Sequence, residues 1–132
     1  MPPRLFTVAE ARAALPEVRS HVEQLLVHRA GQLAASARIA ELTAASAGNG
    51  HGLDGDAVRA ARQELDRAES GIAETLTALD ELGVVVKDVD GGLVDFPSLR
   101  DGEEVFLCWH SGEPELDWWH GADEGFAGRK PI

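Results

Sequence analysis

Most of the residue types that can carry chemistry lie in the last quarter of the chain, between residues 105 and 126. This stretch contains the only cysteine, all three tryptophans and two of the five histidines of the protein. Thiol, imidazole and carboxylate groups are ligands of metals such as zinc or iron, and they also transfer protons. The residues concerned are Cys108, Trp109, His110, Glu113, Glu115, Asp117, Trp118, Trp119, His120, Asp123 and Glu124. A functional site is therefore expected in this segment.

Four of these residues are the candidate ligands of a divalent transition metal, zinc or iron: Cys108, Glu113, His120 and Asp123. A turn predicted at residues 112–114 can fold Glu113 and His120 toward the strand that carries Cys108. A neutral imidazole needs no deprotonation at pH 7, so His120 is expected to be the firmest ligand. Two alternatives stay open, because a single cysteine is commonly a small buried hydrophobe and His120 can be a core histidine bonded to a carboxylate.

A structural pair is predicted between Asp95 and Arg129. Asp95 stands between Val94 and Phe96, so in a strand its side chain points away from both apolar neighbours. A carboxylate there either faces solvent or needs a partner, and a guanidinium binds a carboxylate through two parallel hydrogen bonds. We therefore expect Asp95 and Arg129 to fasten the C-terminal tail to the sheet.

Two long helices are predicted ahead of this segment, from apolar residues that recur at steps of three and four. The first helix opens with a capping box, in which Thr7 and Glu10 exchange hydrogen bonds between side chain and backbone. Pro16 lies inside the pattern and is expected to loosen the second turn, because proline removes an amide donor.

The two helices are expected to pack against each other as an antiparallel hairpin over residues 7–82. Gly and Asn residues between positions 44 and 55 predict a loop, after which Asp54 or Asp56 caps the second helix. Gly83 ends that helix. Neither helix can bury its apolar stripe alone, which favours a hairpin with the packing of a coiled coil.

After Gly83 the sequence changes to the pattern of β-strands, at residues 84–88, 93–96, 105–109 and 116–119. Pro97 is expected to break the second strand, and residues from 121 onward are expected to form an irregular tail. Short turns containing glycine join these strands, which favours antiparallel pairing. The predicted fold is a single α+β domain over residues 1–132, with a long antiparallel helical hairpin and a small antiparallel β-meander in residues 83–132.

The overall charge argues against two classes of partner. With 23 acidic and 12 basic residues the formal net charge is -11, which disfavours binding to nucleic acid phosphates and to anionic membranes.

One cysteine cannot form an internal disulfide, and the first residues lack the apolar run of a signal peptide. A cytoplasmic protein is therefore expected.

Several short motifs resemble one protein family along essentially the whole chain. They include Phe6-Thr7-x-x-Glu10-Ala11, Gly92-Leu-Val-Asp-Phe-Pro97, Trp119-His120 and Gly125-Phe-Ala-Gly-Arg129-x-Pro-Ile132. In these motifs the sequence resembles the bacterial DUF2203 family. That family is a domain of unknown function, so the resemblance implies no activity, cofactor or catalytic residue. Its members tend to carry a long basic residue at the position of His110, which ranks His110 below His120 as a ligand.

Two functions follow from the sequence, and whether any reaction is catalysed is left open. The first is a small metal-binding protein that uses the C-terminal Cys, Glu and His residues. The second is a non-enzymatic interaction or assembly module, with self-association into a homo-oligomer through the helical hairpin or with another protein as partner. A carboxylate di-iron bundle is disfavoured, because Glu17, His21 and His28 do not form the Glu-x-x-His motif that such bundles use.

Overall fold

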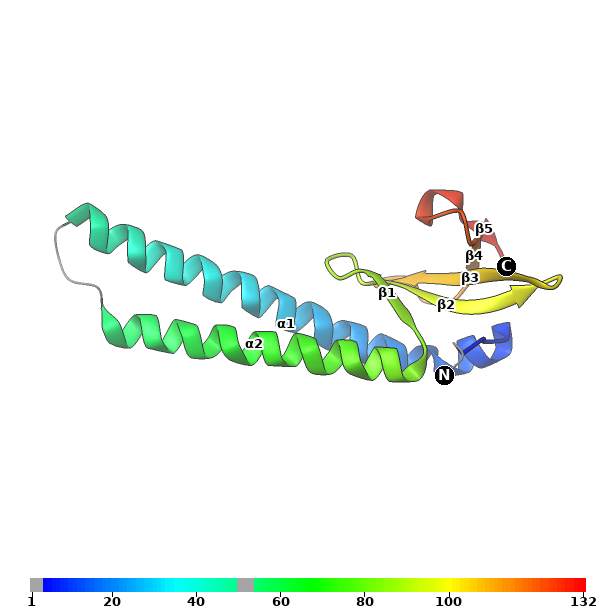
Figure 1. The fold of residues 1–132 in the computed structure, drawn as a ribbon, viewed down its shortest axis with the longest axis horizontal. Coiled ribbons are helices and arrows are strands. Elements are labelled where there is room, and N and C mark those ends of the chain that lie inside the picture. The colour runs from blue at the N-terminus through cyan, green and yellow to red at the C-terminus, as the bar shows by residue number, and fades with distance from the viewer. Residues whose placement is uncertain (1–3, 50–53) are drawn as a thin grey trace.

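The computed structural model describes residues 4–49 and 54–132. Two long helices, α1 (Val8–Asn49) and α2 (Gly55–Leu82), form one layer, and an antiparallel sheet lies over one end of it (Figure 1). Its strands are β1 (Val85–Asp88), β2 (Leu93–Arg100), β3 (Glu103–His110), β4 (Trp118–Gly121) and β5 (Lys130–Pro131), with the 3₁₀ helix η1 (Phe126–Gly128) before β5. The strands follow one another in the order of the sequence. The predicted α+β fold, a helical hairpin followed by an antiparallel meander, is confirmed.

Helix α1 begins with the predicted capping box. The Thr7 N–H donates to Glu10 Oε1 at 2.9 Å, and the Glu10 N–H donates to Thr7 Oγ1 at 3.0 Å. The bond from the Thr7 backbone lowers the pKa of Glu10, because it favours the ionised carboxylate. The helix continues through Pro16 to Asn49, so the loop predicted from residue 44 begins later than expected. Alanines at the start of that segment explain the extension, since alanine has the highest helix propensity.

Helix α2 has the predicted signals at both ends. Asp54, rather than Asp56, is the N-cap, because its Oδ1 accepts from the Ala57 N–H at 3.0 Å. At the other end Gly83 adopts a left-handed conformation with φ 88°, which ends the helix at Leu82. The remaining part of the predicted loop, residues 50–53, lies outside the described residues.

The prediction that Pro97 breaks its strand is wrong, because β2 continues to Arg100. Pro97 pairs with Phe106 of β3, and its carbonyl accepts from the Phe6 N–H at 2.7 Å. In an extended strand the N–H and C=O of one residue point to the same side, so the missing donor faces Phe6 rather than β3. Proline is tolerated because the β2–β3 ladder loses no hydrogen bond. The predicted tail is also more regular than expected, since β5 pairs with β4.

The hydrophobic core lies between the sheet and the end of the hairpin that the sheet covers. One face of the sheet and one stripe of α1 supply most of it. Leu79 of α2 and Val84, which follows α2, also belong to the core. From α1 come Ala11, Leu15, Val18, Val22 and Leu25, and from the sheet come Val94, Phe96, Leu107 and Trp109. Every second side chain along this part of β2 and β3 therefore packs against α1 and holds the sheet on the helix.

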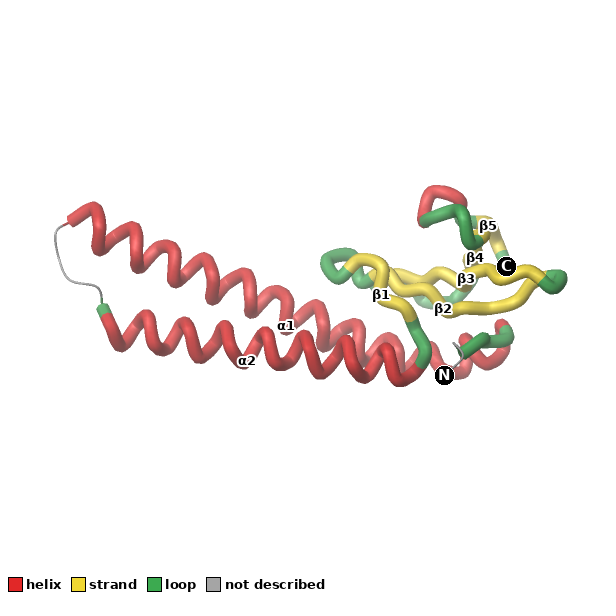
Figure 2. Tube along the Cα trace, viewed as in Figure 1, coloured by secondary structure: helices red, strands yellow, loops and turns green. Residues whose placement is uncertain are grey.

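The opposite face of the sheet is covered as well. Asp95, Cys108 and His120 alternate with the core residues and so point away from the helices, yet none of them is more than 4% exposed. Figure 2 shows the chain after β4, including η1, on the side of the sheet away from the helices. We call residues 122–128 the covering segment. It shields polar side chains on a sheet face that would otherwise meet water.

The far end of the hairpin extends beyond the sheet (Figure 1). We call residues 33–49 and 55–68 the arm. Buried hydrophobic residues in it are small or β-branched: Ala35, Val58, Ala61 and Ala68. Such side chains let the two helices approach closely, and the larger Ile39, Leu42 and Leu65 are only partly buried. Neither helix, over the residues that the structure describes, has the length and apolar character needed to cross a membrane.

Candidate metal centre

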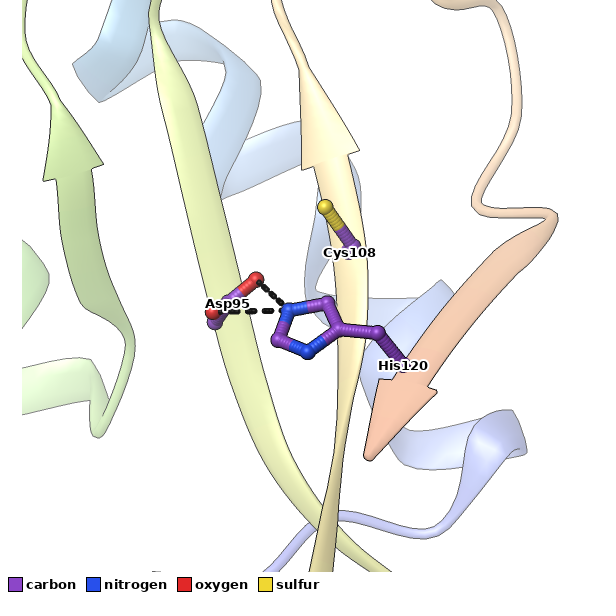
Figure 3. Close-up of side chains that lie close together, drawn as sticks. All are labelled: Asp95, Cys108 and His120. Atoms are coloured by element: carbon purple, nitrogen blue, oxygen red, sulfur yellow. Dashed lines mark hydrogen bonds and ion pairs between the residues drawn. The ribbon is translucent and has the colours of Figure 1, made fainter. Parts of the chain in front are cut away.

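Three neighbouring strands bring Asp95, Cys108 and His120 together on the covered face of the sheet (Figure 3). Asp95 of β2 lies directly opposite Cys108 of β3, and His120 of β4 lies opposite Phe106, the next residue of β3 on the same face. One ligand atom from each of the three side chains lies within 4.8 Å of the other two. All three are buried, at 1%, 1% and 4% exposure respectively. We call these residues the triad.

The His120 ring is held between two hydrogen-bond acceptors. Nδ1 lies 2.9 Å from the carbonyl oxygen of Gly121, and Nε2 lies 3.1 Å from each carboxylate oxygen of Asp95. A carbonyl can only accept, so Nδ1 carries a proton. The Nε2 lone pair of that tautomer would face an ionised carboxylate, which also can only accept. The gap between Nε2 and Asp95 therefore requires a cation, either a proton or a metal ion.

The Cys108 thiol is protonated at neutral pH. Burial of the thiol is the main reason that its pKa is raised to about 12, and the negative charge of nearby Asp95 is the second reason. A free thiol of this kind is a poor nucleophile, because the thiolate is the reactive form. A metal ion that contacts both groups would remove the repulsion between thiolate and carboxylate. The site is accordingly better suited to metal ligation than to covalent catalysis by cysteine.

The structure brings together two of the four predicted ligands, Cys108 and His120, and it replaces the other two with Asp95. Glu113 is engaged elsewhere: its Oε2 accepts from Arg129 Nη2 at 2.6 Å, and its Oε1 accepts from the His110 N–H at 2.9 Å. The turn after β3 folds Glu113 back onto the end of its own strand rather than onto the triad. Asp123 lies exposed in the covering segment.

The predicted pair between Asp95 and Arg129 is wrong among the residues that the structure describes. Asp95 pairs with His120, and Arg129 pairs with Glu113. The strand order explains the difference, because Arg129 directly precedes β5 at the outer edge of the sheet, whereas β2 is three strands away. The Arg129 guanidinium also lies 4.9 Å from the Trp118 ring centroid and 4.6 Å from that of Phe126. It still fastens the tail, but to the β3–β4 connection.

The other histidines on the described chain have ordinary structural contacts. His21 lies 4.0 Å from Glu17 on α1, and His28 of α1 packs against Gly71 of α2, where an added Cβ would lie 2.5 Å from the ring. His110 shares a face with Cys108, as alternation predicts, but its ring contacts Ser111 and Glu113. None of these three belongs to the triad.

A cavity of about 180 Å³ adjoins the triad. Its walls include all three triad residues, Lys87 of β1, and residues of the covering segment. Glu124 organises that segment, because its Oε1 accepts from the Gly121 N–H at 3.1 Å and from Lys130 Nζ at 2.5 Å. Both hydrogen bonds lower the pKa of Glu124, and the bond from Lys130 has the larger effect. A small molecule or ion can therefore contact a triad that is otherwise buried.

Comparison with known proteins identifies one family. The sequence profile of the family described as "Uncharacterized conserved protein (DUF2203)" matches residues 4–132. No curated protein and no solved structure matches the chain. That description names no reaction and no ligand.

Proposed function

Because this chain belongs to the DUF2203 family of uncharacterised conserved proteins, we propose its function from the triad: it binds a divalent transition metal, zinc or iron. Asp95, Cys108 and His120 are the proposed ligands. The observation that carries the proposal is the approach of a carboxylate, a thiol and an imidazole to within 4.8 Å of one another in a buried site.

The donor set suits such a metal. Zinc takes nitrogen, sulfur and carboxylate ligands in tetrahedral sites, where neighbouring ligand atoms are about 3.5 Å apart. The His120 and Asp95 atoms, at 3.1 Å, are already close to that spacing. The hydrogen bond from Nδ1 to the Gly121 carbonyl leaves Nε2 as the ligand atom, as in most histidine sites with an outer hydrogen-bond partner.

The charges also favour a dication. The carboxylate of Asp95 and the thiolate of Cys108 together carry two negative charges in a buried environment, where an uncompensated charge is costly. A divalent ion balances both, and His120 contributes as a neutral ligand. This balance explains how two acidic groups can share one buried position.

The proposal predicts that His120→Ala weakens zinc binding by on the order of 100-fold or more, because it removes one of the three protein ligands and its outer hydrogen bond to Gly121. Isothermal titration calorimetry on protein purified without an affinity tag measures this. His21→Ala is the matched control, since His21 lies on α1 outside the triad. Because His120→Ala can also disturb folding, Cys108→Ser provides a second and nearly isosteric test.

Zinc affinity should also rise with pH in the neutral range. Burial raises the pKa of Cys108 to about 12, so the thiol proton leaves when the metal binds, and this step alone raises affinity up to about tenfold per pH unit. Cys108→Ser should make this dependence shallower, because it removes the thiol proton from the exchange. Absence of binding by the wild type, or equal affinities for wild type, His120→Ala and Cys108→Ser, would rule out the triad as the site.

A second candidate function is assembly of two copies of the chain through the hairpin. The observation in its favour is that the arm extends beyond the sheet while α1 exposes Val27 and Leu33, at 69% and 53%. Val27 and Leu33 are six residues apart, so they lie roughly 120° apart around α1, and an interface that buries both would cover about a third of the circumference of the helix. We propose that a second copy of the chain binds this surface. The resulting homodimer is compatible with metal binding in each copy.

Sedimentation velocity at micromolar concentration tests the assembly. The dimer should dissociate into monomers in the variant Val27→Glu/Leu33→Glu, because a charge would be buried at the interface. Leu99→Glu is the matched control, since Leu99 is 54% exposed but belongs to β2. A wild type that sediments only as a monomer would exclude the dimer.

A further inference from the structure

We propose that the metal keeps one coordination position open toward the adjoining cavity, and that this position binds a short monocarboxylate with Lys87 as its counter-ion. The inference rests on the proposed metal function and adds to it a class of ligand. It follows from the protein ligands that the triad offers, from the charge of the cavity and from its size.

The cavity walls do not offer a free fourth ligand. Besides the triad they consist of Lys87, Leu93, Phe106, Ala122, Glu124, Gly125 and Phe126. Glu124 is the one anionic side chain among these, and its carboxylate already accepts from the Gly121 N–H and from Lys130. Metal sites with three protein ligands complete their shell with water or a substrate, whereas structural zinc sites are closed by four. The triad is therefore arranged as an open site.

The charge on the cavity walls favours a monoanion. A divalent metal is neutralised by Asp95 and the Cys108 thiolate, and Glu124 is offset by Lys130. Lys87 then remains as a positive charge, and within the described residues it forms no ion pair. Its Nζ lies 5.6 Å from the Phe106 ring centroid, and the Phe106 ring lies 5.5 Å from that of His120. Lys87 is thus near the triad on the cavity side.

The volume and the apolar walls restrict the anion further. A cavity of 180 Å³ has room for more than one water molecule, each of which takes roughly 30 Å³ in the liquid. A carboxylate with a short aliphatic chain fits this space. One oxygen would replace the water on the metal, and the chain would contact Leu93, Phe106 and Phe126. Burial of that chain favours an organic carboxylate over a small inorganic anion.

Cobalt substitution provides the test, because Co²⁺ reports its coordination in the visible spectrum and shows a charge-transfer band when a thiolate binds it. Acetate and propionate are titrated into the Co²⁺ protein at constant ionic strength, with chloride as the inorganic comparison. We expect both carboxylates to shift the visible bands saturably, with propionate binding more tightly than acetate. Lys87→Gln should weaken carboxylate binding about tenfold with unchanged cobalt affinity, and Lys87→Arg should restore it.

Arg38→Gln is the matched control, because it removes one positive charge from an exposed position on the arm. Its carboxylate affinity should equal that of the wild type. A cobalt–thiolate band that no carboxylate alters would overturn the open position while leaving the metal site intact. Equal carboxylate affinity in wild type and Lys87→Gln would overturn the role of Lys87. A wild type without the cobalt–thiolate band would contradict the proposed metal function itself.

Discussion

Replacing either Asp95 or His120 with alanine is expected to lower the free energy of unfolding of the metal-free protein by about 3–5 kcal/mol. The two side chains are 2% and 5% exposed, and they bond to each other at 3.1 Å. Removal of one partner leaves the other buried without its counter-charge. That desolvation cost, rather than the strength of the pair, sets the size of the effect.

A double-mutant cycle followed by urea unfolding measures this effect. The variant Asp95→Ala/His120→Ala should lose less than the sum of the two single variants by about 1–3 kcal/mol, because neither buried group is then left alone. Glu17 and His21 provide the control pair on α1, where a carboxylate and an imidazole lie 4.0 Å apart and partly exposed. Their cycle should give less than about 0.5 kcal/mol. Additive losses at Asp95 and His120 would show that the two side chains act independently.

Gly92→Ala is expected to destabilise the protein by about 3 kcal/mol or more. Gly92 is buried in the β1–β2 turn and has φ 62°. An added Cβ would lie 2.8 Å from Ser111 Cβ and 2.9 Å from Val22 Cγ1. The substitution combines an unfavourable backbone conformation with a clash against α1, so it pushes the sheet away from the helix on which it packs.

Gly102→Ala separates these two contributions. Gly102 also has a positive φ, 81°, but an added Cβ there would meet no atom within 4 Å. Its cost should be about 1–2 kcal/mol, the backbone contribution alone. Thermal unfolding of both variants provides the comparison. If the two variants melted at the same temperature, close packing of the β1–β2 turn against α1 could not be a source of stability.

Local signals were sufficient to predict most of the fold. The capping box at Thr7, the caps at Asp54 and Gly83, and the change from helical to strand periodicity all describe contacts within a few residues. Errors arose where a distant segment determines the outcome. Pro97 stays inside β2 because Phe6, far away in the sequence, occupies the side of the strand that lacks a donor. No pattern around residue 97 contains that information.

The site was only half predictable for the same reason. Residue types identified Cys108 and His120, but nearness in sequence favoured Glu113 and Asp123 over Asp95. A usable signal for Asp95 existed: the Asp101-Gly102 turn pairs Arg100 with Glu103, and counting outward along both strands places Asp95 opposite Cys108. The position of His120 depends on the longer connection between β3 and β4, whose geometry the sequence does not specify.

The contacts at the base of α1 determine the order in which the chain can fold. Phe6, Arg12 and Arg19 bond to residues 92 to 104 positions later, on β2 and in the β3–β4 connection. Each of these contacts closes a long loop of the chain. Closing the loop costs conformational entropy before the contact can stabilise the fold. Such long-range contacts slow folding relative to a simple helical hairpin. The helix pair can form early from the loop outward, whereas the apolar base of α1 stays exposed until the sheet has assembled. Docking of the sheet is therefore the step expected to limit the folding rate, and the metal site, built from three strands, is complete only after it.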